Sequence, residues 1–215
     1  MPRTLAAQMI ALATLTLAAC TPQTPDVSAS ANGTTSTPTA VHSAPSVASP
    51  TPSPRRSPAP TAGPDQDMTT PPSRPAGLDG PATEVSAREV GIYFLELFPY
   101  ALATGDLRDW DALSGKDCRY CAHLRAIITD VHDAGNHGTG GAYEFGFATA
   151  VERENGDFVV GIEYVETPSR TVTADGSVVE DFADRYSMKA VLELHWSGSA
   201  WAVEAGKATE FGAAS

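Results

Sequence analysis

The pattern of apolar positions divides the chain into three parts. Residues 5–17 are almost all apolar, residues 21–80 hold few large apolar side chains, and beyond residue 80 apolar positions recur with regular spacing. Because a regular apolar pattern is what allows helices and strands to pack, we expect one folded domain over residues 81–215.

The first half of this predicted domain has a helical period. Apolar residues three or four positions apart predict one helix over residues 83–104, ended by Gly105. Ser86 and Glu89 match a capping box near its start. Pro99 lies inside the helix and predicts a kink or a loosened turn, because proline lacks the amide hydrogen.

Two shorter helices are expected to follow. Asp106 is placed to cap the first and Asp117 to cap the second, since Asp side chains accept hydrogen bonds from free amides at helix starts. The second of these helices is expected to end at Gly135. The glycines after it predict a flexible turn: Gly138, Gly140 and Gly141.

Beyond residue 141 the period changes to two. Alternation predicts strands near residues 143–151, 158–164, 171–174, 186–196 and 201–203. Asn155-Gly156 predicts a hairpin turn between the first two strands. Helices followed by strands indicate an α+β fold, in which N-terminal helices pack on a curved antiparallel sheet.

The amino-terminal 20 residues have the pattern of a bacterial lipoprotein signal. The apolar run is followed by small residues and then by Cys20, and it is too short to span a membrane. We therefore predict that residues 1–19 are a signal peptide that is removed and that Cys20 is lipidated. The alternative is an ordinary secretory signal with a chance cysteine.

Residues 20–80 are predicted to be the lipidated cysteine and a disordered tether. Of the 17 prolines in the chain, 13 lie in residues 21–80, among many Ser, Thr and Ala residues. Such a segment buries too little apolar surface to offset its conformational entropy. It suits a spacer that holds a domain away from a membrane.

The charge and the lysine content suggest a compartment and exclude one class of partner. The net charge is −12, which disfavours nucleic acid as a partner. Three lysines against 11 arginines are typical of a high-GC bacterial genome. We expect the protein to be located at the outer face of the cytoplasmic membrane. The expected partners are the membrane, through the lipid on Cys20, and an envelope protein or cell-wall component.

Cys118 and Cys121 form the most distinctive local motif. Outside the cell, such a pair is expected to oxidise to a disulfide. It is either a structural staple at a helix start or a thiol–disulfide exchange pair. A thioredoxin-like pair is expected near a βαβ pattern, so helices that precede the strands favour the staple. Zinc requires two further ligands, and only His123 lies nearby.

The remaining candidate chemistry is sparse. His132, Asp133 and His137 flank the predicted end of the third helix without a clear ligand set. The sequence has no recognisable Ser/His/Asp arrangement and no phosphate-binding glycine loop. We expect no catalytic residues, no metal and no cofactor.

The layout resembles the nuclear-transport-factor-2-like fold, in which N-terminal helices are set into the concavity of a strongly bent sheet. The ending, residues 192–203, is similar to the last hairpin common in that superfamily. More closely, residues 100–106, 113–114 and 118–121 resemble an uncharacterised lipoprotein family of high-GC Gram-positive bacteria. That family also joins a lipid signal and a tether to such a domain, and it brings no catalytic residues.

The resemblance implies a concave pocket between the first helix and the sheet. Tyr93, Tyr164 and Trp196 are its candidate lining residues, and the alternative is that these aromatic side chains fill it as core. Glu163 and His195 lie on the opposite faces of their strands by alternation.

Three hypotheses about the function of the protein follow from the sequence. The first is a membrane-anchored envelope lipoprotein that presents a small non-catalytic binding or interaction domain. The second is a small-molecule-binding or isomerase-like pocket in the same domain, which an open cavity with polar lining would favour. The third is thiol–disulfide exchange through Cys118 and Cys121.

Overall fold

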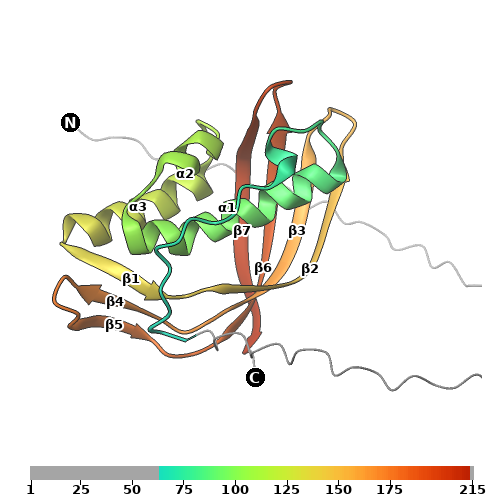
Figure 1. The fold of residues 1–215 in the computed structure, drawn as a ribbon. Coiled ribbons are helices and arrows are strands. Elements are labelled where there is room, and N and C mark those ends of the chain that lie inside the picture. Colours follow the sequence, from blue (N-terminus) through green and yellow to red (C-terminus); the bar gives the residue numbers. More distant parts are fainter. Residues whose placement is uncertain (1–62, 214–215) are drawn as a thin grey trace, which may run out of the picture. The chain divides into compact units, whose positions relative to one another are not determined.

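The computed structural model of the chain describes residues 63–213, so the predicted signal peptide, Cys20 and most of the predicted tether lie outside the described residues. Helices come first and strands follow (Figure 1). The helical elements are η1 (Ala76–Leu78), α1 (Glu84–Thr104), α2 (Arg108–Leu113) and α3 (Arg119–Asp133). The strands are β1 (Asn136–Gly140), β2 (Tyr143–Glu152), β3 (Phe158–Glu166), β4 (Ser169–Thr173), β5 (Val178–Phe182), β6 (Tyr186–Trp196) and β7 (Trp201–Ala213).

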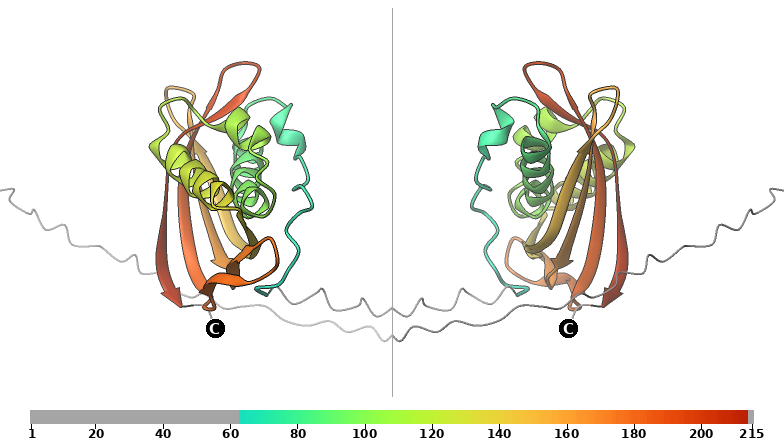
Figure 2. Two further views of the ribbon diagram at one scale, coloured as in Figure 1. Left: turned by 90° about the vertical axis from the view of Figure 1, so that its left-hand side faces the viewer. Right: turned by 90° about the vertical axis from the view of Figure 1, so that its right-hand side faces the viewer.

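The core lies between α1 and a bent four-stranded sheet of order β2-β3-β6-β7. All its neighbouring strands are antiparallel, and bulges interrupt the register of β2 with β3 and of β6 with β7. Such bulges increase local twist and bend a strand. The helices all lie on one face of the sheet (Figure 2). The predicted α+β fold class is confirmed, with the arrangement that the nuclear-transport-factor-2-like resemblance implied.

The start of α1 differs from the predicted capping box. Thr83 is the N-cap, and its hydroxyl accepts a hydrogen bond from the amide of Ser86 at 3.1 Å. Ser86 is buried in the first turn, and its hydroxyl donates to the carbonyl oxygen of Pro81. Glu89 turns away to accept from the amide of Gly77 at 3.1 Å. The side chains of Ser86 and Glu89 thus hold the segment before the helix, while Thr83 caps the helix itself. The helix ends at Gly105 in the left-handed conformation, as predicted.

A second sheet, of order β1-β4-β5, replaces the predicted flexible glycine turn and single meander. Gly138 and Gly140 belong to β1, which pairs with β4. A β-carbon at Gly140 would come within 2.6 Å of the carbonyl oxygens of Gly63 and Pro168, so glycine is required there for close packing of backbone. β5 was not predicted because all five of its residues are exposed and show no apolar alternation.

Residues 63–79, called the strap from here on, pack against the domain instead of continuing the predicted tether to residue 80. The indole nitrogen of Trp201 donates to the carbonyl oxygen of Gly77 at 2.9 Å, and Leu78 is buried. At the other end, the hydroxyl of Thr139 donates to the carbonyl oxygen of Pro64 at 2.8 Å. The folded region therefore begins earlier than the sequence pattern indicated, because contacts distant in sequence hold the strap.

Candidate ligand-binding cleft

An open cleft of about 690 Å³ lies between α3, the end of α1 and the sheet. Its floor comes from β2, β3, β6 and β7, so the bend of the sheet and the position of α3 create it together. Its lining residues are Phe98, Arg119, Tyr120, His123, Leu124, Tyr143, Tyr164, Glu166, Met188, Gly206, Lys207 and Ala208. A neighbouring cavity of about 50 Å³ shares Phe98, Tyr143 and Glu166 with it.

Aromatic side chains form much of the wall. The rings of Tyr143 and Tyr164 have centroids 4.6 Å apart, and Phe145 packs 6.1 Å from Tyr164. Tyr120 comes from the first turn of α3 and lies over Gly206 on β7. Offset and tilted aromatic contacts of this kind provide a large, rigid apolar surface.

Among the described residues that line the cleft, Glu166 is the one carboxylate. It is the last residue of β3, on the face that carries the buried residues Val160, Ile162 and Tyr164. Burial raises the pKa of Glu166 above its ordinary value. Within residues 63–213 no side chain or backbone group forms a hydrogen bond or ion pair with this carboxyl group.

Three tyrosine hydroxyls accompany this carboxylate. Burial, with a smaller contribution from the negative charge of Glu166, raises the pKa of Tyr120 to about 12. Burial likewise raises the pKa values of Tyr143 and Tyr164, again with help from Glu166. These hydroxyls therefore stay protonated at neutral pH and can donate hydrogen bonds. None of them has a hydrogen-bond partner in the described part of the chain.

The outer rim of the cleft is basic. Arg119, His123 and Lys207 line it, and all three are exposed. The cleft thus combines an apolar wall, a half-buried carboxyl group with neighbouring hydroxyl donors, and cationic groups at the rim. This arrangement can hold a mainly apolar molecule that carries a few polar groups.

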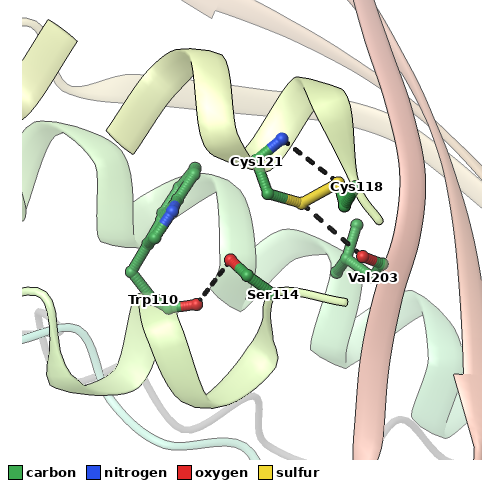
Figure 3. Close-up of a disulfide and its surroundings, with 5 residues drawn as sticks. All are labelled: Trp110, Ser114, Cys118, Cys121 and Val203. Carbon is green, nitrogen blue, oxygen red and sulfur yellow. Dashed lines mark hydrogen bonds between the residues drawn. A yellow bond between two sulfur atoms is a disulfide. The ribbon is translucent and has the colours of Figure 1, made fainter. Parts of the chain in front are cut away.

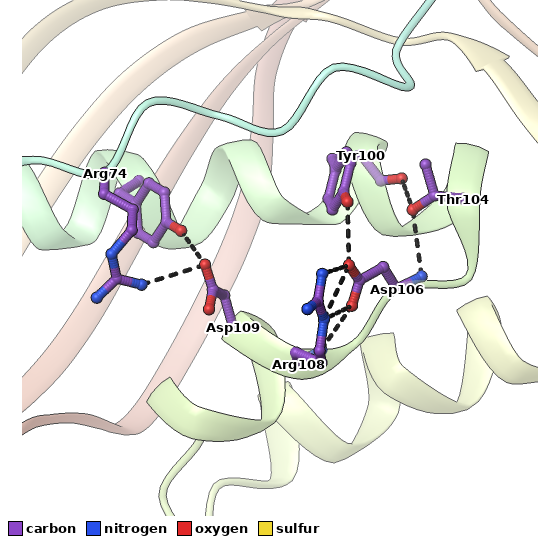
Figure 4. Close-up of polar contacts among 7 residues, drawn as sticks. Arg74, Tyr100, Thr104, Asp106, Arg108 and Asp109 are labelled. Carbon is purple, nitrogen blue, oxygen red and sulfur yellow. Dashed lines mark hydrogen bonds and ion pairs between the residues drawn. The ribbon is translucent and has the colours of Figure 1, made fainter.

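The structure brings only one of the three predicted pocket residues into this cleft. Tyr164 lines it, whereas Tyr93 and Trp196 do not. The hydroxyl of Tyr93 donates to Asp109 on α2, and Asp109 also pairs with Arg74 of the strap at 3.3 Å (Figure 4). Trp196 packs against Trp201, with ring centroids 5.2 Å apart. Figure 4 also shows Asp106, which accepts from the backbone amide and the side chain of Arg108.

The other polar candidates have structural partners. His195 and Asp157 form a pair at 2.7 Å, and Glu163 pairs with Lys189 at 3.5 Å. The ring of His132 lies 3.2 and 3.0 Å from the carbonyl oxygens of Ala101 and Leu102, near the end of α1. Over residues 63–213 no group of three or more His, Cys, Asp or Glu side chains could hold a metal ion.

Cys118 and Cys121 are joined by a disulfide at the start of α3 (Figure 3). Cys118, not the predicted Asp117, is the N-cap: its sulfur accepts from the amide of Cys121 at 3.1 Å. The two residues are only 3% and 1% exposed, and Cys121 Sγ lies 3.5 Å from the carbonyl oxygen of Val203 on β7. Exchange requires a thiolate to reach a sulfur atom, so this burial favours the structural staple.

Sequence reasoning missed Glu166, Tyr120 and Tyr143 as candidate site residues. A signal for Glu166 was present, because alternation along β3 places it on the same face as Ile162 and Tyr164. A charged residue on the apolar face of a strand is unusual and points to a site. Tyr120 gave no such signal, because its place in the cleft depends on the packing of α3 against β7.

Comparison with known proteins identifies a family but no activity. No curated protein matches the sequence. Among solved structures, the intermembrane space region of the chloroplast protein ARC6 is 12% identical, with a TM-score of 0.49 and coverage of 61% of this chain and 100% of that chain. ActVI-ORFA from Streptomyces coelicolor is 14% identical, with a TM-score of 0.39 and coverage of 59% and 94%. Aln2 from a Streptomyces species is 12% identical, with a TM-score of 0.39 and coverage of 60% and 93%.

Likeness at these identities says nothing about substrates. The family match is of a different kind, because it covers most of the chain, the strap included. Residues 55–207 match the sequence model of the family of unknown function DUF6318, and the chain belongs to this family.

Proposed function

We propose that this domain binds a small molecule in the cleft between α3 and the sheet, and that a lipid on Cys20 holds it at the outer face of the cytoplasmic membrane. The observation that carries the binding proposal is the open cleft of about 690 Å³ with unpartnered polar groups on its wall. Small-molecule sites are mainly apolar concavities of roughly 300–1,000 Å³ with a few convergent polar groups.

The unpartnered groups argue against the alternative that the cleft is simply a gap in the packing. Partial burial of the Glu166 carboxyl group disfavours its charged form and so costs folding free energy at neutral pH. Glu166 bears this cost beside three hydroxyls that also lack partners in residues 63–213. A ligand with both a donor and an acceptor would satisfy these groups.

A fluorescent probe tests the proposal. N-phenyl-1-naphthylamine is a neutral aromatic molecule whose emission rises in apolar sites. Saturable binding is expected for the wild-type protein and strong loss of binding for Ala208→Phe, which fills the cleft from β7. Thr209→Phe adds the same ring on the neighbouring exposed residue and should bind as the wild type does. Equal binding by both variants would contradict the proposal.

Isomerase-like chemistry is a second candidate, favoured by Glu166 itself. A carboxyl group with a raised pKa beside protonated tyrosines has the properties of a general acid–base group. Once a ligand is known, Glu166→Gln separates the candidates. Turnover lost with binding retained would favour catalysis, and a wild-type protein that leaves the ligand unchanged would exclude it.

The membrane anchor rests on the sequence pattern at Cys20, which lies outside the described residues. Among the helices of residues 63–213, none has the length and hydrophobicity of a membrane span. A lipid supplies about 0.8 kcal/mol per buried methylene group, and two acyl chains give stable attachment. Cys20→Ala is expected to move the full-length protein to the soluble fraction, and retention in membranes would refute the anchor.

Display of a surface for an envelope protein or cell-wall component stays a prediction. The exposed apolar side chains of β5, Val178, Val179 and Phe182, are compatible with it. Crosslinking in intact cells would test it independently of the cleft.

A further inference from the structure

We infer that the ligand of this cleft is an amphipathic anion: an apolar body that lies on the tyrosine wall, with a carboxylate, sulfonate or phosphate group at the rim beside Arg119 and Lys207. This inference rests on the proposed binding function and adds the chemical class of the ligand. It follows from where the unpaired charges of the domain lie.

Most cations of the described domain are paired with carboxylates. The Lys and Arg side chains in ion pairs are Arg74, Arg108, Lys116, Arg125, Arg153, Arg170, Arg185 and Lys189. Over residues 63–213, only Arg88, Arg119 and Lys207 form no such pair. Two of these three line the cleft.

This distribution is notable because the chain is strongly acidic, with a net charge of −12. Carboxylates are plentiful, yet Arg119 and Lys207 at the mouth of one cleft have none within ion-pair distance among residues 63–213. Lys207 pairs across the sheet with Val191, so its side chain leaves the edge strand β7 on the face opposite to Gly206 and Ala208 and lies at the edge of the cleft. Unpaired cations at the edge of a concavity create a positive potential that attracts anions.

Glu166 sets the orientation of the ligand. Its carboxyl group is half-buried, whereas Arg119 and Lys207 are exposed. A negative group placed beside Glu166 would be repelled, and the repulsion is strongest where water is excluded. The anionic end therefore lies at the rim, and an end with a hydrogen-bond donor faces Glu166. The middle lies on Tyr143, Tyr164 and Met188.

Two probes with one skeleton test the charge requirement. 8-Anilino-1-naphthalenesulfonate carries a sulfonate, and N-phenyl-1-naphthylamine is the same molecule without it. The wild-type protein is expected to bind the sulfonate about fivefold more tightly at low salt, the size given by two exposed charge contacts. The preference should shrink as salt rises, because screening weakens exposed charge pairs.

Variants show which residues cause the preference for the sulfonate. The double variant Arg119→Gln/Lys207→Gln should lose the preference for the sulfonate, measured as the ratio of its affinities for the two probes. Arg88→Gln removes the third unpaired cation, which lies outside the cleft, and should keep the preference. Circular dichroism and thermal midpoints check that each variant is folded.

The outcomes separate this inference from the function on which it rests. If neither probe binds, or if Ala208→Phe leaves both bound, the cleft is not a binding site and the proposed function fails. If both probes bind the cleft with equal affinity and the double variant leaves both affinities unchanged, the cleft is a binding site but its ligand is not an anion. The inference of an anionic ligand is then overturned. A preference lost equally in Arg88→Gln would also overturn it, because the effect would then be general charge.

Discussion

The ring of Tyr120 lies directly over Gly206, so that a β-carbon added to Gly206 would come within 2.6 Å of Cδ1 and 3.0 Å of Cγ of that ring. Tyr120 belongs to the first turn of α3 and Gly206 to β7. The absence of a side chain on β7 thus lets the first turn of α3 approach the sheet where the cleft opens. This contact sets the position of the ring in the wall.

Gly206→Ala is expected to push Tyr120 out of place and to weaken probe binding. Overpacking of a tight contact costs about 1–3 kcal/mol of unfolding free energy. Gly212→Ala is the matched control on the same strand, because nothing lies within 4 Å of its added β-carbon. Urea unfolding and probe titration check both variants. If the two variants have equal stability and equal probe affinity, the contact between Gly206 and Tyr120 does not shape the cleft.

Glu166→Gln is expected to stabilise the protein at neutral pH more than at acid pH. Burial raises the pKa of Glu166, so between its unfolded and folded pKa values the folded protein holds a proton that the unfolded chain has released. Stability contributed by this group is therefore lost as the pH rises through that window. The amide variant stays neutral and avoids this loss.

The measurement is the difference in thermal midpoint between Glu166→Gln and the wild type at about pH 3.5 and pH 7, below and above the ordinary glutamate pKa of about 4.3. The thermal midpoint of Glu166→Gln should exceed that of the wild type by more at pH 7 than at pH 3.5. Glu163→Gln, on the opposite face of β3 and paired with Lys189, should show no such gain. The same difference at both pH values would refute a raised pKa.

Loss of the disulfide should destabilise the domain. The bond closes a short loop, for which chain entropy gives about 2 kcal/mol. Cys118→Ser is therefore expected to lower the free energy of unfolding by about that amount, and reduced wild-type protein should behave alike. If reduction leaves the thermal midpoint unchanged, the structural role is wrong.

Removal of the strap should also destabilise the domain. A chain that starts at Pro81 loses the burial of Leu78, worth about 1.5–3 kcal/mol, and leaves the buried indole nitrogen of Trp201 without its acceptor, a loss of about 1 kcal/mol or more. A chain that starts at Arg55 should be more stable by about 2–4 kcal/mol in urea. Equal midpoints would mean that the strap only rests on the surface.

The elements that depend on local sequence were predictable. The helix ended by Gly105 and the alternating strands that became β3 and β6 follow from periods of 3.6 and two residues. The strap was not predictable, because Gly77 and Leu78 are held by contacts such as the bond from Trp201, which lies more than a hundred residues away. β5 was missed because every one of its residues is exposed.

The site was predictable only in part. Alternation puts Tyr164 on the apolar face of β3, and the same alternation would have reached Glu166 two residues further along this strand. Tyr93 and Trp196 lie on predicted apolar faces, but α2 and the strap cover the first and Trp201 covers the second. The packing of the helices on the sheet decides which aromatic residues line an open cleft. The pattern of apolar residues along the sequence does not contain that information.

The position of a bound probe on the protein decides whether the cleft is the binding site. Isotope-labelled protein can be titrated with 8-anilino-1-naphthalenesulfonate while backbone amide resonances are followed by NMR. Shifts are expected to concentrate on cleft residues of α3, β3 and β7, with Tyr120, Tyr164 and Lys207 among the largest. Shifts confined to the exposed apolar residues Phe147 and Val151 of β2, with the cleft unmoved, would contradict it.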